Sequence, residues 1–206
     1  MQNFPITETF LSFQGEGMHA GRRAFFVRFF GCNVKCPWCD SKSAWEGTPA
    51  KIMSAEEIAG IAVESRAEIV VITGGEPCIH NLQTLLTLLN SAKIKAHLET
   101  SGTLPIREID EARFDWVALS PKFFAPPLKE SLARADELKF IISNSGELED
   151  CKALAAAAIS AKAFWLHPEW SKVGDKKLLS DICDFICKEG GKFRAGWQLH
   201  KNYFAR

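Results

Sequence analysis

The sequence predicts an α/β fold in which parallel strands alternate with helices. Short apolar runs recur along the 206 residues, and segments with helical spacing separate most of them. Polar or glycine-rich segments follow several of these runs directly, as expected where parallel strands end at a functional rim. The pattern is compatible with a full or partial barrel and with a doubly wound sheet. The length suits a single domain spanning residues 1–206.

The expected strands are short runs rich in apolar residues. They cover residues 24–30, 68–73, 95–99, 116–119, 138–143, 163–166 and 193–199. The first helix has the clearest start, because Ser54 followed by Glu57 forms a capping box. Further helices are expected at residues 81–92, 129–137, 146–159 and 175–188.

The composition excludes several classes of protein. Lys plus Arg equals Asp plus Glu at 25 each, so nothing indicates a strongly basic surface that binds nucleic acid. No apolar run approaches the roughly 20 residues of a membrane-spanning helix, and the first residues lack the features of a signal peptide. We therefore expect a cytoplasmic protein with no nucleic-acid or membrane partner. In that compartment, its seven cysteines favour metal or redox chemistry over disulfides.

Three of the cysteines lie within eight residues. Cys32, Cys36 and Cys39 follow the first expected strand, and thiolates this close can hold one iron–sulfur cluster. Three thiolates on a [4Fe-4S] cluster leave one iron open for a ligand that takes part in the reaction. The alternative is a zinc loop completed by a distant histidine or by Cys78, because structural zinc normally takes four ligands.

The remaining cysteines give weaker signals. Cys183 and Cys187 are four residues apart on an expected helix, and Cys151 lies on another. We interpret these three as small hydrophobic residues that pack in the core. Cys78, beside a glycine-rich segment, stays ambiguous.

The cysteine spacing, with Trp38 before the last cysteine, resembles the signature of the radical S-adenosylmethionine superfamily. In that superfamily the open iron binds the amino and carboxylate groups of S-adenosylmethionine. Longer collinear segments resemble the 7-carboxy-7-deazaguanine synthase family, and together they span most of the chain. These segments are residues 13–17, 26–28, 39–41, 72–80, 99–103, 120–122 and 198–201.

The resemblance implies an activity and a set of cofactors. Members convert 6-carboxy-5,6,7,8-tetrahydropterin to 7-carboxy-7-deazaguanine with loss of ammonia, on the route to queuosine and related deazapurines. The implied cofactors are a [4Fe-4S] cluster, S-adenosyl-L-methionine and Mg²⁺. Removing an unactivated hydrogen from a saturated carbon requires radical chemistry that side chains do not provide, so we expect no catalytic side chain.

The resemblance also implies a fold and partners. A full eight-unit barrel needs roughly 250 residues, so this chain should form an incomplete, TIM-like barrel with about six parallel strands and a reduced set of helices. Besides the small-molecule substrate 6-carboxytetrahydropterin, the implied partners are a second copy in a homodimer and an external electron donor such as flavodoxin.

Site residues carry over to the matching positions. Ser41, two residues after the last cysteine ligand, is the implied magnesium ligand, with a helix cap beside Asp40 as the alternative. Arg28 suits a bidentate grip on the substrate carboxylate, with a surface ion pair as the alternative, and Glu16 holds the loop. The implied substrate-binding residues are Phe13, Gln14, Gly15, Arg28, Thr100 and Arg206. The implied cofactor-binding residues are Trp38, Cys39, Asp40, Gly74, Gly75, Glu76, Gly102, Ser120, Pro121, Lys122 and His167.

Two other functions remain open on the sequence. A small activase of the same superfamily, which installs a glycyl radical on a partner protein, would present a large partner-binding surface. Gln14, Gly15 and Arg28 favour the synthase over this activase, because they match its substrate-binding segments. A non-catalytic zinc or iron–sulfur module is the second alternative, from a different class of protein.

Overall fold

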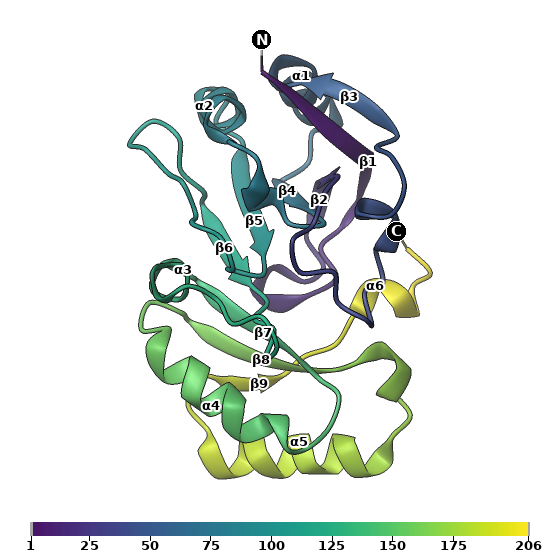
Figure 1. The fold of residues 1–206 in the computed structure, drawn as a ribbon, viewed down its shortest axis with the longest axis vertical. Helices are drawn as coiled ribbons and strands as arrows, with labels where there is room; N and C mark the ends of the chain where they lie inside the picture. Colours follow the sequence, from purple (N-terminus) through teal and green to yellow (C-terminus); the bar gives the residue numbers. More distant parts are fainter. Residues whose placement is uncertain (1, 206) are drawn as a thin grey trace.

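The computed structural model describes residues 2–205 and is built around one sheet (Figure 1). Its strands are β1 (Asn3–Phe13), β2 (Arg23–Phe29), β3 (Lys51–Ser54), β4 (Ile69–Gly74), β5 (Lys95–Thr100), β6 (Trp116–Leu119), β7 (Glu137–Ile142), β8 (Ala163–Pro168) and β9 (Phe193–Ala195). Its helices are α1 (Ala55–Ser65), α2 (Gln83–Ser91), α3 (Lys129–Arg134), α4 (Glu147–Ala157), α5 (Lys176–Glu189) and α6 (Leu199–Asn202).

The strand order shows an open, mostly parallel sheet. It runs β3-β1-β2-β4-β5-β6-β7-β8-β9 across nine strands. From β2 onward all neighbours are parallel, whereas β1 is antiparallel to both β2 and β3. The two edge strands, β3 and β9, do not pair with each other within residues 2–205. The incomplete barrel is therefore confirmed, with seven parallel strands where about six were expected.

Two strands, β1 and β3, were missing from the sequence-based prediction. A register shift between Ile6 and Glu8 interrupts the pairing of β1 with β2. Because such a bulge moves the following side chains to the other face, Ile6 packs in the helix-covered core whereas Phe10 stacks on Phe26 on the opposite face. The alternation expected of a strand is therefore broken. β3 has only four residues and merges into the start of α1.

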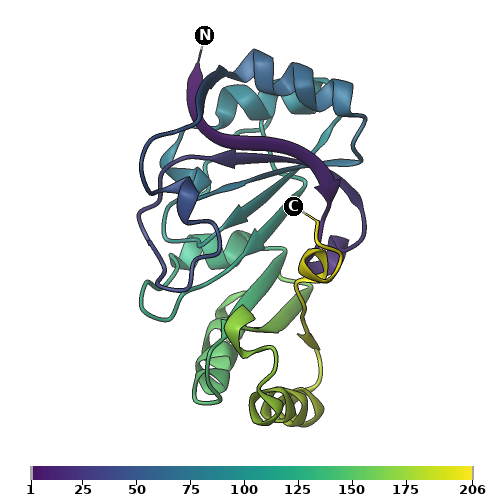
Figure 2. The same cartoon turned by 90° about the vertical axis from the view of Figure 1, so that its right-hand side faces the viewer.

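The helices cover one face of the sheet and leave the other face for the site (Figure 2). On β2, Phe25 and Val27 belong to a core that includes residues of α1 and α2, whereas Phe26 packs with Val71 on the other side. A second core joins β6, β7 and β8 to α3, α4 and α5. We call the helix-covered side the outer face and the opposite side the inner face.

Several predicted boundaries differ from the observed ones. The capping box at α1 is confirmed, because the Ser54 and Glu57 side chains each accept a backbone N–H. The expected strand at residues 193–199 ends at Ala195, and Leu199 begins α6. The helix expected at residues 129–137 ends at Arg134, because Ala135 is extended and leads into β7.

The cysteines outside the cluster separate into two groups. Cys78 and Cys151 are buried in the first and second cores, respectively. Cys183 and Cys187 are exposed, so their interpretation as core residues was wrong. The buried residues of α5 include Ile182, and one helical step turns the next side chain by about 100°, away from the sheet.

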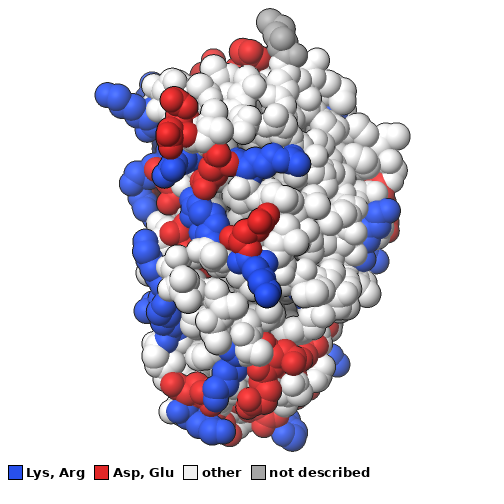
Figure 3. Space-filling model, turned by 60° about the vertical axis from the view of Figure 1, so that its left-hand side comes forward, with Lys and Arg blue, Asp and Glu red and all other residues white. Residues whose placement is uncertain are grey.

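Within residues 2–205, no helix combines the length and the apolar character needed to cross a bilayer. On the face seen in Figure 3, Lys and Arg side chains lie among Asp and Glu side chains instead of forming one basic patch.

Candidate functional site

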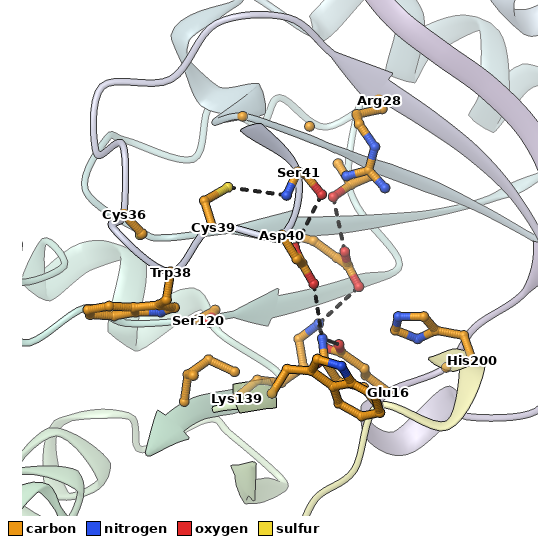
Figure 4. A pocket seen from close by; sticks show the side chains of 18 of the residues that line it. Glu16, Arg28, Cys36, Trp38, Cys39, Asp40, Ser41, Ser120, Lys139 and His200 are labelled. Carbon is orange, nitrogen blue, oxygen red and sulfur yellow. Dashed lines mark hydrogen bonds and ion pairs between the residues drawn. The ribbon is translucent and has the colours of Figure 1, made fainter. Parts of the chain in front are cut away.

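A cavity of about 690 Å³ lies on the inner face (Figure 4). Its volume is within the range of roughly 300–1,000 Å³ that is usual for small-molecule sites. Most of the predicted site residues line it, although they come from segments far apart in the sequence. Those residues are Phe13, Gln14, Gly15, Arg28, Cys32, Cys36, Trp38, Cys39, Asp40, Ser41, Gly74, Gly75, Thr100, Ser120 and Lys122.

The three clustered cysteines lie on one closed loop, residues 31–44, which we call the cysteine loop. Its two ends are joined at the base, where the Gly31 N–H donates to the Ala44 carbonyl at 2.7 Å. The Asn33 amide donates to the Thr103 hydroxyl at 3.0 Å, which ties the loop to the segment after β5. The loop therefore presents its thiols from a braced backbone.

The surroundings of the thiols suit an iron–sulfur cluster. The Val34 and Ser41 N–H groups donate to Cys32 Sγ and Cys39 Sγ, both at 3.4 Å. Such bonds stabilise negative charge on sulfur and tune clusters. Burial raises the pKa of the Cys36 thiol and Lys122 opposes that rise. No group of three or more His, Cys, Asp or Glu side chains among the described residues is arranged to hold a single metal ion.

The glycine-rich segment after β4 fits tightly against the cysteine loop. A side chain at Gly75 would overlap the Gly31 carbonyl oxygen, so only glycine allows this approach. The Glu76 side chain is buried behind the cavity wall, where its carboxylate accepts bonds from the Thr100 hydroxyl at 2.7 Å and the Ser101 N–H at 2.8 Å. Gly74 and Gly75 face the cavity, and Glu76 braces the two strand ends behind them.

A row of polar side chains crosses the inner face from strand to strand. We call these five residues the inner-face row: Glu8, Arg28, Thr73, Glu99 and Lys139, from β1, β2, β4, β5 and β7. Arg28 Nε donates to Glu8 Oε1 at 2.9 Å. Glu99 accepts bonds from the Thr73 hydroxyl and from Lys139 Nζ, both at 3.0 Å. The ion pair considered as the alternative role of Arg28 thus exists, but it forms part of the cavity wall.

The loop between β1 and β2, residues 14–22, is joined to this row. Gln14 Nε2 donates to Glu99 Oε1 at 3.1 Å, and Lys139 Nζ donates to Glu16 Oε2 at 3.0 Å. Burial acts to raise the pKa of Glu16, but Lys139, His167 and Gln198 together outweigh it and hold that pKa well below its usual range. Burial likewise acts to lower the pKa of Lys139, and Glu16 and Glu99 raise it instead. We call residues 14–22 the β1–β2 loop.

The C-terminal segment closes the wall between the β1–β2 loop and the cysteine loop. His200 lies so close to Gly15 that a side chain there would overlap its ring, and the Leu199 N–H donates to the Gly15 carbonyl at 2.9 Å. Lys201 Nζ donates to Asp40 Oδ2 at 2.9 Å. Burial acts to raise the pKa of Asp40, but the bond and the charge of Lys201, together with the bond from Gln198, lower it overall.

Figure 4 shows that the cavity has two sides. The loop residues Asp40 and Ser41 lie between these sides, and Ser41 Oγ donates to Asp40 Oδ1 at 3.3 Å. One side carries Cys36, Trp38 and Ser120, and the other carries Arg28, Glu16 and His200.

Some predicted residues lie outside the cavity wall. His167 is 1% exposed, and neither of its ring nitrogens has a hydrogen-bond partner within the described chain. Burial lowers the pKa of His167 to about 4. The other predicted residues behind the wall are Glu76, Gly102 and Pro121. Arg206 lies outside the described residues.

Other residues that line the cavity had been assigned no binding role from the sequence. His200 and Lys201 lie in a polar segment near the C-terminus, and Glu99 ends an apolar run, so their positions after strands were the available signal. Lys139 could have been found as a single charge inside the apolar run at residues 138–143. Glu8 lies on the strand that was not predicted. Others that were missed are Thr73, Trp170 and Gln198.

The chain is similar to a family model and to several known proteins. Residues 26–151 match the Radical SAM superfamily. The 7-carboxy-7-deazaguanine synthase of Synechocystis sp. is 40% identical over 200 residues, which cover 97% of this chain and 92% of the relative. The enzyme of the same name from Escherichia coli is 34% identical, over 96% of this chain and 97% of its own. The crystal structure of QueE from Escherichia coli superposes with a TM-score of 0.79 at 32% identity, covering 96% of this chain and 95% of that one.

Proposed function

The chain belongs to the Radical SAM superfamily and, within it, to the 7-carboxy-7-deazaguanine synthases, and from this membership we propose that it converts 6-carboxy-5,6,7,8-tetrahydropterin to 7-carboxy-7-deazaguanine with release of ammonia. The observation that carries the proposal is the joint presence of Arg28, Glu99 and the three clustered cysteines on the wall of one cavity. Relatives match over nearly their whole length, which favours a synthase over an activase or a zinc module.

The residues on the cysteine side fit the cofactors of this family. Cys32, Cys36 and Cys39 would hold the [4Fe-4S] cluster, and Gly74 and Gly75 line the adjoining wall for S-adenosylmethionine. When bound, these groups supply the removal of hydrogen from a saturated carbon, which no side-chain base performs.

The donor set between the two sides suits magnesium. Ser41 and Asp40 place a hydroxyl and a carboxylate oxygen on the cavity wall, and Mg²⁺ prefers such oxygen ligands while sharing others with substrate and water. We propose Ser41 as the protein ligand. Its position between the cofactor side and the substrate side agrees with an ion that contacts substrate oxygens.

The inner-face row provides complementary groups for the two ends of a carboxylated pterin. The Arg28 guanidinium can take the substrate carboxylate, since the pairing of these two planar groups is favourable. The pterin edge is rich in N–H donors, and Glu99 and Glu16 offer acceptor oxygens on the same wall. Because Lys139 bonds to both carboxylates, it fixes their position.

The C-terminal segment shields the reaction from water. Gln198 Nε2 donates to Glu16 at 2.9 Å and to Asp40 at 3.3 Å, so one side chain connects the substrate side to the cysteine loop. Exclusion of water limits the quenching of reactive intermediates. We propose that this segment forms the closing wall of the substrate site.

Further proposals concern the assembly, the electron donor and the location of the protein. We propose that the chain acts as one domain in a homodimer, receives its electron from flavodoxin and works in the cytoplasm. Analytical ultracentrifugation and reduction assays with flavodoxin would test the dimer and the electron donor.

The proposed function is tested by turnover under strict anaerobiosis. The reconstituted protein, given dithionite, S-adenosylmethionine, Mg²⁺ and 6-carboxytetrahydropterin, should form 7-carboxy-7-deazaguanine, detected by mass spectrometry. Omission of S-adenosylmethionine should abolish the product. Cleavage of S-adenosylmethionine without formation of the deazaguanine acid would retain the superfamily chemistry and reject this substrate.

A further inference from the structure

β7 carries two charged side chains on the inner face, and the proposed mechanism uses only one of them. Lys139 lines the cavity, whereas Glu137, two residues earlier, does not. Glu137 is 2% exposed and forms no ion pair with any residue that the structure describes. A buried carboxylate without a paired cation is costly, so its presence calls for a physical reason.

The Glu137 carboxylate is held by three N–H donors. The Met18 backbone N–H donates to Oε2 at 2.8 Å. The Trp165 indole donates to the same oxygen at 2.7 Å, and the Trp116 indole donates to Oε1 at 3.1 Å. Burial raises the pKa of Glu137, although Lys139 and these donors oppose the rise. Hydrogen bonds to a charged acceptor are about twice as strong as neutral ones, and they offset part of the burial cost.

Of these three donors, Met18 is the one that belongs to the β1–β2 loop. The loop makes its short turn, η1 (Gly17–His19), directly against Glu137. A side chain at Gly17 would overlap the Glu137 carboxylate, and its φ of +68° also favours glycine. His19 continues this contact, with ring centroids 4.5 Å from His97 and 4.6 Å from Trp116.

The opposite side of the same loop lines the substrate part of the cavity through Gln14, Gly15 and Glu16. β7 therefore holds the loop at two points, since Lys139 bonds to Glu16 and Glu137 bonds to Met18. The two anchors are two residues apart both on β7 and on the loop, so together they define the depth and the tilt of the loop.

We propose that Glu137 is a positioning residue for the substrate, which holds Met18 and thereby places Gln14, Gly15 and Glu16 against the bound pterin without touching it. The proposal rests on the proposed function and adds a determinant of substrate affinity. It explains the buried carboxylate, because an apolar residue at this position would leave the Met18 N–H and two indole N–H groups without acceptors.

The test replaces Glu137 by glutamine in the reconstituted enzyme. Glutamine keeps the size of the side chain but turns one acceptor oxygen into an N–H₂ donor that faces existing donors. We expect the KM for 6-carboxytetrahydropterin to rise about tenfold, equivalent to about 1.4 kcal/mol, with kcat changed less than about twofold. Cleavage of S-adenosylmethionine in the absence of substrate should be unchanged, because the cysteine side of the cavity is not altered.

Trp116→Phe is the matched control. It removes the donor to Oε1 but leaves Oε2 and its bond to Met18 in place, so its KM should stay within about twofold of wild type. Gly17→Ala disturbs the same contact from the loop side and should reproduce the KM increase. The double variant should then show less than the sum of the two effects, because both act through one contact.

Hydrogen exchange of the peptide that covers residues 14–22 provides a readout independent of turnover. Exchange should be faster in Glu137→Gln and Gly17→Ala and unchanged in Trp116→Phe. An unchanged KM in Glu137→Gln, or an equal KM increase in Trp116→Phe, would overturn the proposal. If the wild type makes no deazaguanine acid, the proposed function fails, whereas the exchange data still test whether Glu137 holds the loop.

Discussion

Charged residues that lie inside apolar strand segments define the proposed substrate side of this site. Arg28 follows Phe26 and Val27 on β2, and Lys139 lies in the apolar run of β7. Each would be costly to bury alone, and each is matched by a carboxylate, Glu8 for Arg28 and Glu99 for Lys139. The resulting wall is preorganised before any ligand binds, which reduces the cost of binding.

Arg28→Lys tests the carboxylate grip at the residue scale. Lysine keeps the charge but loses the planar fork, and loss of a charge-assisted hydrogen bond worth about 1.5–3 kcal/mol predicts a fall in kcat/KM of roughly tenfold to hundredfold. Arg22→Lys is the control, because Arg22 pairs with Glu68 on the exposed surface and such pairs contribute little. Equal kinetics in both variants and wild type would remove Arg28 from the substrate site.

Cys36→Ala tests the assignment of the cluster ligands. Two thiolates cannot hold the cluster as three do, so the reconstituted variant should lose most of its iron and all S-adenosylmethionine cleavage. The matched control is Cys187→Ala, because Cys187 is exposed on α5, and this variant should keep about four irons per chain, the content of a [4Fe-4S] cluster. The measurements are iron and sulfide content and electron paramagnetic resonance after reduction. Full iron content in Cys36→Ala would contradict the assignment.

At the scale of elements, loops at the strand ends are braced against one another. The Glu76 N–H donates to the Gly31 carbonyl at 2.8 Å, which joins the end of β4 to the cysteine loop. The Glu76 side chain then bonds to Thr100, the last residue of β5, and to Ser101, which follows it. One residue thus connects three consecutive segments of the rim. This network explains how a loop with little regular structure can hold its ligands in place.

Helix α1 offers a test of local stability. Both halves of its capping box are present, with the Glu57 N–H donating to Ser54 Oγ at 3.1 Å and the Ser54 N–H donating to the Glu57 carboxylate at 2.6 Å. Ser54→Ala should destabilise the protein by about 1 kcal/mol, which for a chain of this size lowers Tm by about 2–4 °C. Ser91→Ala, at the exposed end of α2, is the control. Equal Tm values for the two variants would show that the cap contributes nothing.

For the whole molecule, the histidines lie in buried or half-buried positions. Every one of the five histidines has a lowered pKa, and burial is the largest cause in each case. His97 falls to about 3 and His167 to about 4. They are neutral in the folded protein and have a pKa near 6.5 when unfolded.

The lowered pKa values of the histidines predict how the stability of the protein depends on pH. A histidine whose folded pKa is lowered binds a proton only on unfolding, so its stabilising contribution is complete above about pH 6.5 and decreases as the pH falls below that value. Each such histidine makes the free energy of unfolding decrease by up to about 1.4 kcal/mol per pH unit. Urea unfolding at pH 7 and pH 5 should therefore show a marked loss of stability at pH 5.

His97→Gln isolates one of these contributions. Between pH 7 and pH 5, this variant should lose less stability than wild type. The difference should equal the contribution of the one proton that His97 binds on unfolding. The comparison does not extend below pH 5. Below that value, carboxylates such as Glu16, whose pKa is lowered in the folded state, also contribute to the pH dependence of stability. An identical pH dependence in the variant and wild type would contradict a neutral, buried His97.

Much of the site could be predicted from the sequence because its strongest signals are local. The proposed cluster ligands Cys32, Cys36 and Cys39 lie on one loop, and the spacing along the chain alone brings them together. The capping box of Ser54 with Glu57 acts within one helical turn, and the order of strands and helices follows from short-range periodicity. These features need no distant partner, so the sequence alone determined the cofactor chemistry, the fold class and most of the rim.

The tertiary structure alone decided the features that depend on contacts between distant segments. The partners of Lys139 are separated from it by 123 residues for Glu16 and 40 for Glu99, and no spacing along the chain indicates such a pairing. The bulge in β1, the burial of Glu76 behind the rim and the place of His200 over Gly15 also follow from packing. The physical reason is that a strand's register and a buried charge's partner are determined by which segments the curved sheet brings together.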